Sequence, residues 1–276
     1  MLKNSFTEKS GIIKQRKMRK LKSQRVIIKI GTNVLTDSSG FLEKNIIRNI
    51  ARQVSEIRSK TKRDIIIVTS GAIGAGMAEL GLKSRPDNIV MRQACASVGQ
   101  SILMDKYYRE FSLHKIKIAQ ILLSYGTLNE QKTLMNMKEN INRLFELGVI
   151  PIVNENDAIS TEEIGKSFGD NDIISALLAV KINADLLMLL TNVDGVYNSN
   201  PLSKNSELIK EIHELSDKAI DTTGKSNLGV GGMKTKIEAA KMAVENGVSV
   251  IIANGKSEKI ILKIINGEDV GTLFAV

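Results

Sequence analysis

Two lysines lie beside glycine-containing turns, an arrangement that can bind a phosphate group. Lys29 falls within the apolar segment 25–30 and is followed by Gly31, and Lys236 comes directly after the sequence GVGGMKT. Backbone amides that glycine leaves accessible and fixed ammonium charges both attract phosphate oxygens. For each segment taken alone, an alternative remains: a lysine that extends its amine from a strand end into water, or a glycine loop without a ligand.

Acidic and amide side chains crowd next to two apolar segments. Asp170, Asn171 and Asp172 precede the largely apolar stretch 173–180, and the sequence NENDAIST begins at Asn154, directly after VIPIV. A solvated loop would explain one or two such residues. Because carboxylates are costly to bury without partners, clusters of this size indicate the wall of a ligand site. Asp170 is also a candidate helix cap.

The sequence TSGAIGAGMAELG, which follows the apolar segment 64–69, supplies a hydroxyl and several glycines. Ser70 would stand at the start of a helix, where unpaired backbone amides favour an anion. Gly71, Gly74 and Gly76 would let the backbone approach a ligand, or would serve only helix packing. Their order differs from the dinucleotide-binding fingerprint GxGxxG.

Other familiar motifs are missing. The three GKS triplets, at residues 165–167, 224–226 and 255–257, lack the first glycine of a P-loop five residues earlier. One cysteine and two histidines cannot form a zinc site of known spacing, and they suggest no Ser–His–acid set.

Six short segments rich in β-branched residues alternate with longer amphipathic ones. The segments 25–30, 64–69, 117–123, 148–154, 184–190 and 247–253 are apolar on both faces, as in a parallel sheet covered on both sides. Between them, residues 88–111 place Val90, Ala94, Val98 and Ile102 four apart, which predicts a helix with that stripe buried. The final VGTLFAV indicates an edge strand or a closing hairpin.

These elements predict an α/β fold, a three-layer α/β/α sandwich around a mainly parallel sheet. Ligands of such sheets bind outside the carboxyl ends of the strands. The lysines, glycine turns, aspartates and asparagines described above all follow predicted strands or begin the next helix. We therefore expect them at one edge of the sheet.

The composition is that of a soluble globular protein of 276 residues, with a net charge of +9. Nearly all of this excess lies in residues 1–25, so we expect residues 1–24 to form a disordered basic extension and residues 25–276 to form a single domain. With one cysteine, no signal-peptide pattern and no apolar run of about 20 residues, a cytoplasmic location is expected. Because the body is nearly neutral, we expect neither a membrane nor a nucleic acid as the main ligand.

From about residue 25 to the end, the chain resembles the amino acid kinase family, and within it the glutamate 5-kinases. The resemblance is carried by VIIKIGTNVLT, IVTSGAIGAG, VIPIVNENDA, GDND before SALLA, LLTNVDGVY, GGMKTK and VGTLF. The combination of TSGAI, NENDA and GDND is specific to this group. The chain ends near VGTLF, so the C-terminal PUA-type domain of many members is expected to be absent.

The resemblance implies transfer of the γ-phosphoryl group of ATP to the side-chain carboxylate of L-glutamate, the first step of proline synthesis. It implies catalytic roles for Lys29 and Lys236 on the phosphates and for Asp172 between the two lysines. It implies a substrate site formed by Ser70, Gly71, Ala72, Asp157 and Asn171. The nucleotide would contact Lys29, Gly31, Thr191, Asn192, Val230, Gly231, Gly232, Met233, Lys234, Thr235 and Lys236. Many relatives have aspartate where this chain has Asn192, which leaves a charge-based role there open.

The same resemblance implies further ligands and partners. Mg²⁺ would arrive on ATP, without an assigned protein ligand. Proline is an expected feedback inhibitor, a homo-oligomer is the expected assembly, and a glutamyl phosphate reductase is the expected downstream partner.

Three other functions remain open from the sequence. The nearest is another small-molecule kinase of the same fold, acting on acetylglutamate or a phosphate monoester. A nucleic-acid-binding or regulatory module would use the basic extension. A sensor without catalysis is the third, although both lysines and Asp172 are present.

Overall fold

The computed structural model describes residues 18–276, except residues 38, 39, 125–127, 129, 160–170, 202, 204 and 214–231. Its elements, in chain order, are β1 (Arg25–Ile30), α1 (Thr32–Leu35), α2 (Lys44–Lys60), β2 (Asp64–Val68), α3 (Ala72–Glu79), α4 (Ile89–Ser112), β3 (Ile118–Leu123), α6 (Gln131–Glu146), β4 (Ile150–Glu155), α7 (Asn171–Lys181), β5 (Leu186–Thr191), β6 (Glu211–Ile212), α8 (Met233–Glu245), β7 (Ser249–Asn254), α9 (Ile260–Ile265) and β8 (Thr272–Phe274). The six predicted strands are all present, and each boundary is within two residues of the prediction.

One eight-stranded sheet runs through the molecule in the order β3-β4-β2-β1-β5-β7-β8-β6. Neighbouring strands are parallel except for β7 and β8, which are antiparallel, so the predicted fold class is confirmed. The prediction for the C-terminal segment needs a correction. β8 lies inside the sheet, and the two-residue strand β6, which the sequence analysis missed, forms the edge beyond it.

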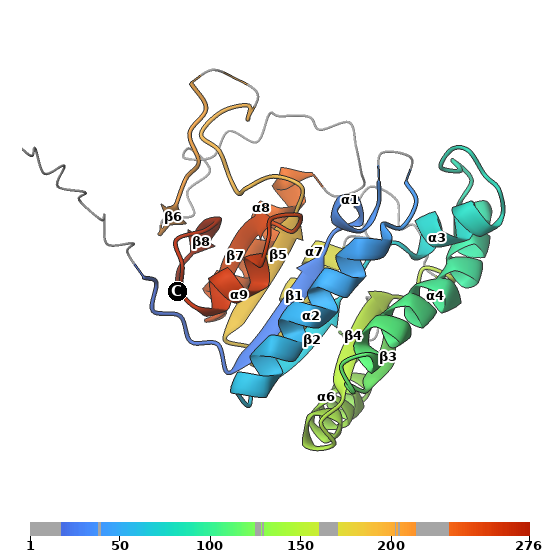
Figure 1. Ribbon diagram of the computed structural model, residues 1–276, viewed down its shortest axis with the longest axis horizontal. Helices are drawn as coiled ribbons and strands as arrows, with labels where there is room; N and C mark the ends of the chain where they lie inside the picture. Colours follow the sequence, from blue (N-terminus) through green and yellow to red (C-terminus); the bar gives the residue numbers. More distant parts are fainter. Residues whose placement is uncertain are drawn as a thin grey trace, which may run out of the picture.

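Helices cover both faces of the sheet (Figure 1). Along β1, Val26, Ile28 and Ile30 pack with α2, α4 and α9 on one face, whereas Ile27 packs with α6, α7 and α8 on the other. This alternation follows from the two-residue period of a strand, and it requires apolar residues at every position. The two cores explain why the strands were recognisable as continuous apolar runs.

Helix α4 buries a different stripe from the predicted one. Val90 is 66% exposed, and the buried residues include Cys95, Gly99, Leu103 and Tyr107. The reason is the contact with α3: a Cβ atom at Gly99 would overlap the carbonyl oxygen of Ala72, so only glycine lets the two helices approach this closely. This contact holds the middle of α4 near the start of α3.

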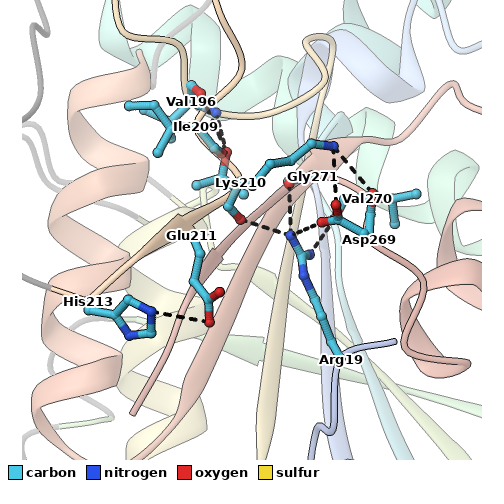
Figure 2. Close-up of polar contacts among 10 residues, drawn as sticks. Arg19, Val196, Ile209, Lys210, Glu211, His213, Asp269, Val270 and Gly271 are labelled. Atoms are coloured by element: carbon cyan, nitrogen blue, oxygen red, sulfur yellow. Dashed lines mark hydrogen bonds and ion pairs between the residues drawn. The ribbon is translucent and has the colours of Figure 1, made fainter. Parts of the chain in front are cut away.

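Part of the segment expected to be disordered lies against the fold. The guanidinium of Arg19 donates to the carbonyl oxygens of Val270 (2.6 Å) and Lys210 (2.8 Å) and to Oδ1 of Asp269 (2.7 Å), as Figure 2 shows. Ser23 is also buried. The packed region therefore begins no later than Arg19, and residues 1–17 lie outside the described part of the chain. Among the described residues, no helix is long and apolar enough to cross a membrane.

Candidate active site

Five adjacent parallel strands, β4, β2, β1, β5 and β7, end at the same edge of the sheet. Asn154 and Glu155 close β4, and Ser70 comes two residues after β2. Lys29 lies at the end of β1, and Thr191 ends β5. The predicted gathering of these residues at one edge is thus observed in the structure.

Lys29, Asp172 and Lys236 form a buried cluster at the centre of this edge, which we call the central triad. Nζ of Lys29 lies 2.5 Å from Oδ1 of Asp172, and Nζ of Lys236 lies 2.9 Å from Oδ2. The three side chains are only 5%, 0% and 8% exposed in the order Lys29, Asp172, Lys236. One carboxylate thus holds two ammonium groups from different elements, β1 and α8, at the start of α7.

The electrostatics of the triad keep its acid ionised. Burial alone would raise the pKa of Asp172, but the charges and hydrogen bonds of Lys29 and Lys236 together outweigh it and lower the pKa below its ordinary value. The three groups therefore carry one net positive charge in a place shielded from water. Because burying unbalanced charge is costly, such a cluster suits an anionic ligand better than it suits stability.

Gly31 lies beside the ammonium of Lys29. It precedes α1 and donates its backbone N–H to the carbonyl oxygen of Leu190, 3.1 Å away. A Cβ atom at this position would lie 3.7 Å from Nζ of Lys29 and 3.2 Å from the Leu190 oxygen. Glycine therefore avoids a tight contact with the Leu190 carbonyl and leaves no side chain against the ammonium of Lys29.

A chain of amide side chains lies on the β2 and β4 side of the triad. Nδ2 of Asn171 donates to Oγ of Ser70 (3.1 Å) and to Oδ1 of Asn154 (3.1 Å), and Nδ2 of Asn154 donates to Oε1 of Gln100 (2.8 Å). Gly71 adopts φ +103°, a left-handed conformation that favours glycine, and this turn leads from Ser70 into α3 at Ala72. The predicted substrate residues Ser70, Gly71, Ala72 and Asn171 therefore lie together.

Asp157 follows β4 and is partly buried. Loss of hydration, reinforced by the nearby charge of Glu155, raises the pKa of Asp157 to about 7, and the more favourable charge of Arg85 only partly offsets this. A carboxyl group with such a pKa changes charge near neutral pH, which is typical of ligand sites.

The predicted nucleotide residues are divided between described and undescribed parts of the chain. Thr191 is buried and pairs with Asn254 of β7, whereas Asn192 is exposed. The described remainder of the predicted loop starts α8: Gly232 precedes the helix, Met233 and Thr235 are partly buried, and Lys234 is exposed. Val230, Gly231 and the predicted helix cap Asp170 lie outside the described residues.

The sequence analysis missed Gln100. It lies in the middle of α4 instead of after a strand, so a search along strand ends passes over it. The available signal was a polar side chain immediately after Gly99, in a helix that packs tightly against the start of α3.

Comparison with known proteins decides the family. A family model described as the amino acid kinase family matches residues 24–254. The chain belongs to the amino acid kinase family. It is 45% identical to the glutamate 5-kinase of Methanosarcina barkeri over 260 residues, covering 91% of this chain and 68% of that protein. It is also 45% identical to the glutamate 5-kinase of Clostridium acetobutylicum over 253 residues, covering 91% of this chain and 94% of that protein.

Two solved structures share the fold of this amino acid kinase. UMP kinase from Ureaplasma parvum superposes with a TM-score of 0.61 at 17% identity, covering 93% of this chain and all of that chain. An isopentenyl phosphate kinase gives a TM-score of 0.63 at 17% identity, covering 91% of this chain and all of that chain. At such identities the likeness extends to the fold and not to the substrate.

Proposed function

We propose that this amino acid kinase transfers the γ-phosphoryl group of ATP to the side-chain carboxylate of L-glutamate, giving L-glutamyl 5-phosphate for proline synthesis. The observation that carries the proposal is the buried central triad at the carboxyl ends of the strands. Two relatives named glutamate 5-kinase, each 45% identical over 91% of the chain, support the choice of acceptor.

The chemistry requires positive charge more than it requires a base. A glutamate side chain has a pKa near 4.3, so it is already ionised at neutral pH and needs no proton removed. The difficulty is that one anion must approach another. At an effective dielectric constant of about 20, two unit charges about 4 Å apart repel by roughly 4 kcal/mol, which corresponds to about a thousandfold in rate.

In this proposal Lys29 and Lys236 supply that positive charge. Both ammonium groups lie within 2.9 Å of an oxygen of Asp172, which fixes their positions before the substrates bind. Preorganised charges stabilise a transition state without reorganisation during the reaction. Asp172 has its two oxygens occupied in this way, which suits a positioning role.

The remaining predicted residues divide along the edge of the sheet. Ser70, Asn171 and Asp157, on the β2 and β4 side, would bind glutamate. Thr191 and the start of α8, on the β5 and β7 side, would face the nucleotide. The acceptor carboxylate and the γ-phosphoryl group would then meet at β1, beside Gly31.

Mg²⁺ is the expected companion of ATP, and bound to the phosphates it would neutralise part of their charge. Within the described part of the chain, no group of three or more His, Cys, Asp or Glu side chains forms a metal site. Both oxygens of Asp172 are engaged by lysines. In this proposal Mg²⁺ is bound by the phosphates of the nucleotide.

Trapping the acyl phosphate tests the proposed function directly. Purified protein is incubated with ATP, Mg²⁺, L-glutamate and hydroxylamine, and formation of γ-glutamyl hydroxamate is measured together with ADP. We expect both products in equal amounts, and neither without glutamate. Absence of the hydroxamate with a folded protein would refute the proposal.

The main rival is a kinase of the same fold with another acceptor, and the two phosphate kinases that share the fold motivate this test. ADP release is measured with N-acetylglutamate, L-aspartate, UMP and isopentenyl phosphate in place of glutamate. The proposal predicts that glutamate gives the highest kcat/KM. A higher value for any other acceptor would favour the rival.

A further inference from the structure

Two buried polar atoms near the triad lack hydrogen-bond partners among the described residues. They are Nε2 of Gln100 and Oδ1 of Asn171. Asn171 as a whole is only 7% exposed, so water does not solvate its free oxygen. A buried donor or acceptor without a partner is costly, and at a candidate site it indicates a missing ligand group.

The chemical identity of both atoms follows from one backbone amide. The N–H of Glu155 donates to Asn154 over 2.9 Å, so the atom of Asn154 that accepts must be its oxygen, Oδ1. Its other atom, Nδ2, is then the donor to Gln100, 2.8 Å away, which makes the accepting atom of Gln100 the oxygen. The atom left over on Gln100 is therefore an NH₂ donor.

The same reasoning extends to the other side of Asn154. Its Oδ1 also accepts from Asn171, 3.1 Å away, so the near atom of Asn171 is Nδ2. That nitrogen donates to Ser70 as well, over 3.1 Å. The atom left over on Asn171 is thus an oxygen acceptor. The site presents one buried donor and one buried acceptor on the two sides of Asn154.

We propose that Gln100 is a specificity-determining residue whose side-chain NH₂ binds the α-carboxylate of the amino acid substrate. This inference rests on the proposed function. A donor requires an acceptor such as a carboxylate, and the free oxygen of Asn171 requires a donor such as an ammonium group. An α-amino acid carries these two groups on one carbon atom, which matches the pair of free atoms.

The position of Gln100 along the edge selects the α-carboxylate over the side-chain carboxylate. The reacting carboxylate must meet the phosphoryl group near the triad at β1, whereas Gln100 bonds to Asn154 of β4, two strands away in the order β4-β2-β1. Two strand spacings are about 10 Å. An extended glutamate with hydrogen bonds of about 3 Å at its ends can span that distance.

Gly99 brings Gln100 to this position. Because a Cβ atom at Gly99 would overlap the carbonyl oxygen of Ala72, α4 approaches the start of α3 only with glycine at this residue. Ala72 itself belongs to the predicted substrate site, so the contact at Gly99 brings this part of α4 next to that site. Gln100 is partly buried, as expected for a side chain that faces a ligand pocket.

The test is an exchange of specificity. Gln100→Glu keeps the oxygen that accepts from Asn154 and replaces only the free NH₂ by an oxygen, so a purely structural role of Gln100 is preserved. Two acceptors are compared: L-glutamate, and L-glutamic acid α-amide, in which the α-carboxylate is a neutral carboxamide. The measured quantity is the ratio of their kcat/KM values, with ATP saturating. The matched control is Gln120→Glu, the same change at an exposed position of β3.

In Gln100→Glu a carboxylate would face the α-carboxylate of glutamate but could accept from the carboxamide. We expect the preference for glutamate over its α-amide to fall by about 100-fold, whereas Gln120→Glu leaves it unchanged. Gln100→Met, which removes the donor without adding charge, should lower the preference by about 10- to 100-fold, the effect of one hydrogen bond to a charged group. This variant decides the question if Gln100→Glu does not fold.

The outcomes separate the two proposals. A wild-type enzyme that forms no hydroxamate from glutamate contradicts the proposed function itself. An active wild type whose preference stays within about threefold in folded Gln100→Glu or Gln100→Met contradicts the role of Gln100. Loss of all turnover with the α-amide in both wild type and Gln100→Glu also contradicts it, because the complementary pair should then be active.

Discussion

Two cation clusters in the described part of the chain differ in what surrounds their charge. In the central triad, two lysines share one carboxylate, and all three side chains are at most 8% exposed. At the far end of the sheet, Arg19 directs its guanidinium at backbone carbonyl oxygens and at Asp269, a carboxylate that is 40% exposed (Figure 2). The shared acid of the triad is fully buried, whereas the acid of the Arg19 cluster is in contact with water and the cluster joins distant segments of the chain.

The Arg19 cluster has the features of a structural tie. Its partners come from residue 210 and from residues 269–271, so one side chain links the start of the described chain to the region of β6 and β8. Arginine suits this role because its planar group presents five donors in a fixed geometry. The backbone carbonyls that accept from Arg19 are part of the fold itself. The net positive charge of the triad, beside Gly31, suits an anionic ligand. Arg19 is as buried as Lys236, so the acceptors distinguish the two clusters: Asp172 is fully buried, whereas Asp269 is 40% exposed and the other acceptors of Arg19 are backbone carbonyls.

The largest expected effect comes from Lys236. Lys236→Ala should lower kcat by about 10³-fold or more, because it removes positive charge where two anions must meet. Thermal unfolding should show that the fold survives. Steady-state hydroxamate formation measures the effect, and Lys241→Ala, on the same helix, is the matched control. Turnover within threefold of wild type would exclude Lys236 from the mechanism.

Asp172→Asn separates the acid's positioning role from the charge of the lysines. It leaves two buried ammonium groups without their shared carboxylate, and breaking a buried ion pair in this way costs about 3–5 kcal/mol of unfolding free energy. Urea denaturation measures the loss, and ATP should restore part of it because phosphates replace the missing negative charge. An unchanged denaturation midpoint would show that the carboxylate of Asp172 does not stabilise the two buried lysines.

Many of the strands and site residues could be predicted from the sequence, for physical reasons. Strands buried on both faces leave uninterrupted apolar runs, and residues that follow parallel strands must gather at one edge. Lys29 and Asp172 were therefore expected at this edge from their positions, and the resemblance to the family supplied their roles. The strand β6, with two residues, is too short to leave such a signal.

The features that could not be predicted from the sequence depend on contacts between distant segments of the chain. A spacing of four residues fits either of two neighbouring stripes on α4, and the contact of Gly99 with α3 selects the one that excludes Val90. Gln100 was missed because its place at the site also depends on a contact between elements, here between α4 and β4. The charge of the N-terminal segment indicated solvation, but the burial of Arg19 depends on carbonyl groups some 190 to 250 residues away in the chain, which no local pattern reveals.

Arg19→Ala tests the other side of the comparison. It should lower the free energy of unfolding by about 1–3 kcal/mol through lost hydrogen bonds, while kcat stays within about threefold. Arg19→Lys should recover only part of the stability, since an ammonium group cannot reproduce the planar set of donors. Denaturation and turnover are measured on the same samples. A fall in kcat comparable to that of Lys236→Ala would remove the distinction between site and tie.

The smallest effect concerns Asp157, whose pKa is raised from 3.8 to about 7 by burial and by the charge of Glu155, against the favourable charge of Arg85. Glutamate keeps its α-ammonium charge across this range, so it should bind better once Asp157 is ionised. We expect kcat/KM for glutamate to rise by about tenfold between pH 6 and pH 8, the change in ionised fraction around a pKa of 7.

The raised pKa of Asp157 also affects the stability of the ligand-free protein. Because the pKa is raised in the folded state, Asp157 lowers the stability of the ligand-free protein as the pH rises from about 4 to 7. Asp157→Asn should remove both pH dependences and raise the KM for glutamate far more than the KM for ATP. If the variant keeps the wild-type pH profile, another group is titrating, and Glu155, the next nearest acid, becomes the residue to test. An equal rise in both KM values would argue that Asp157 does not contact the amino acid.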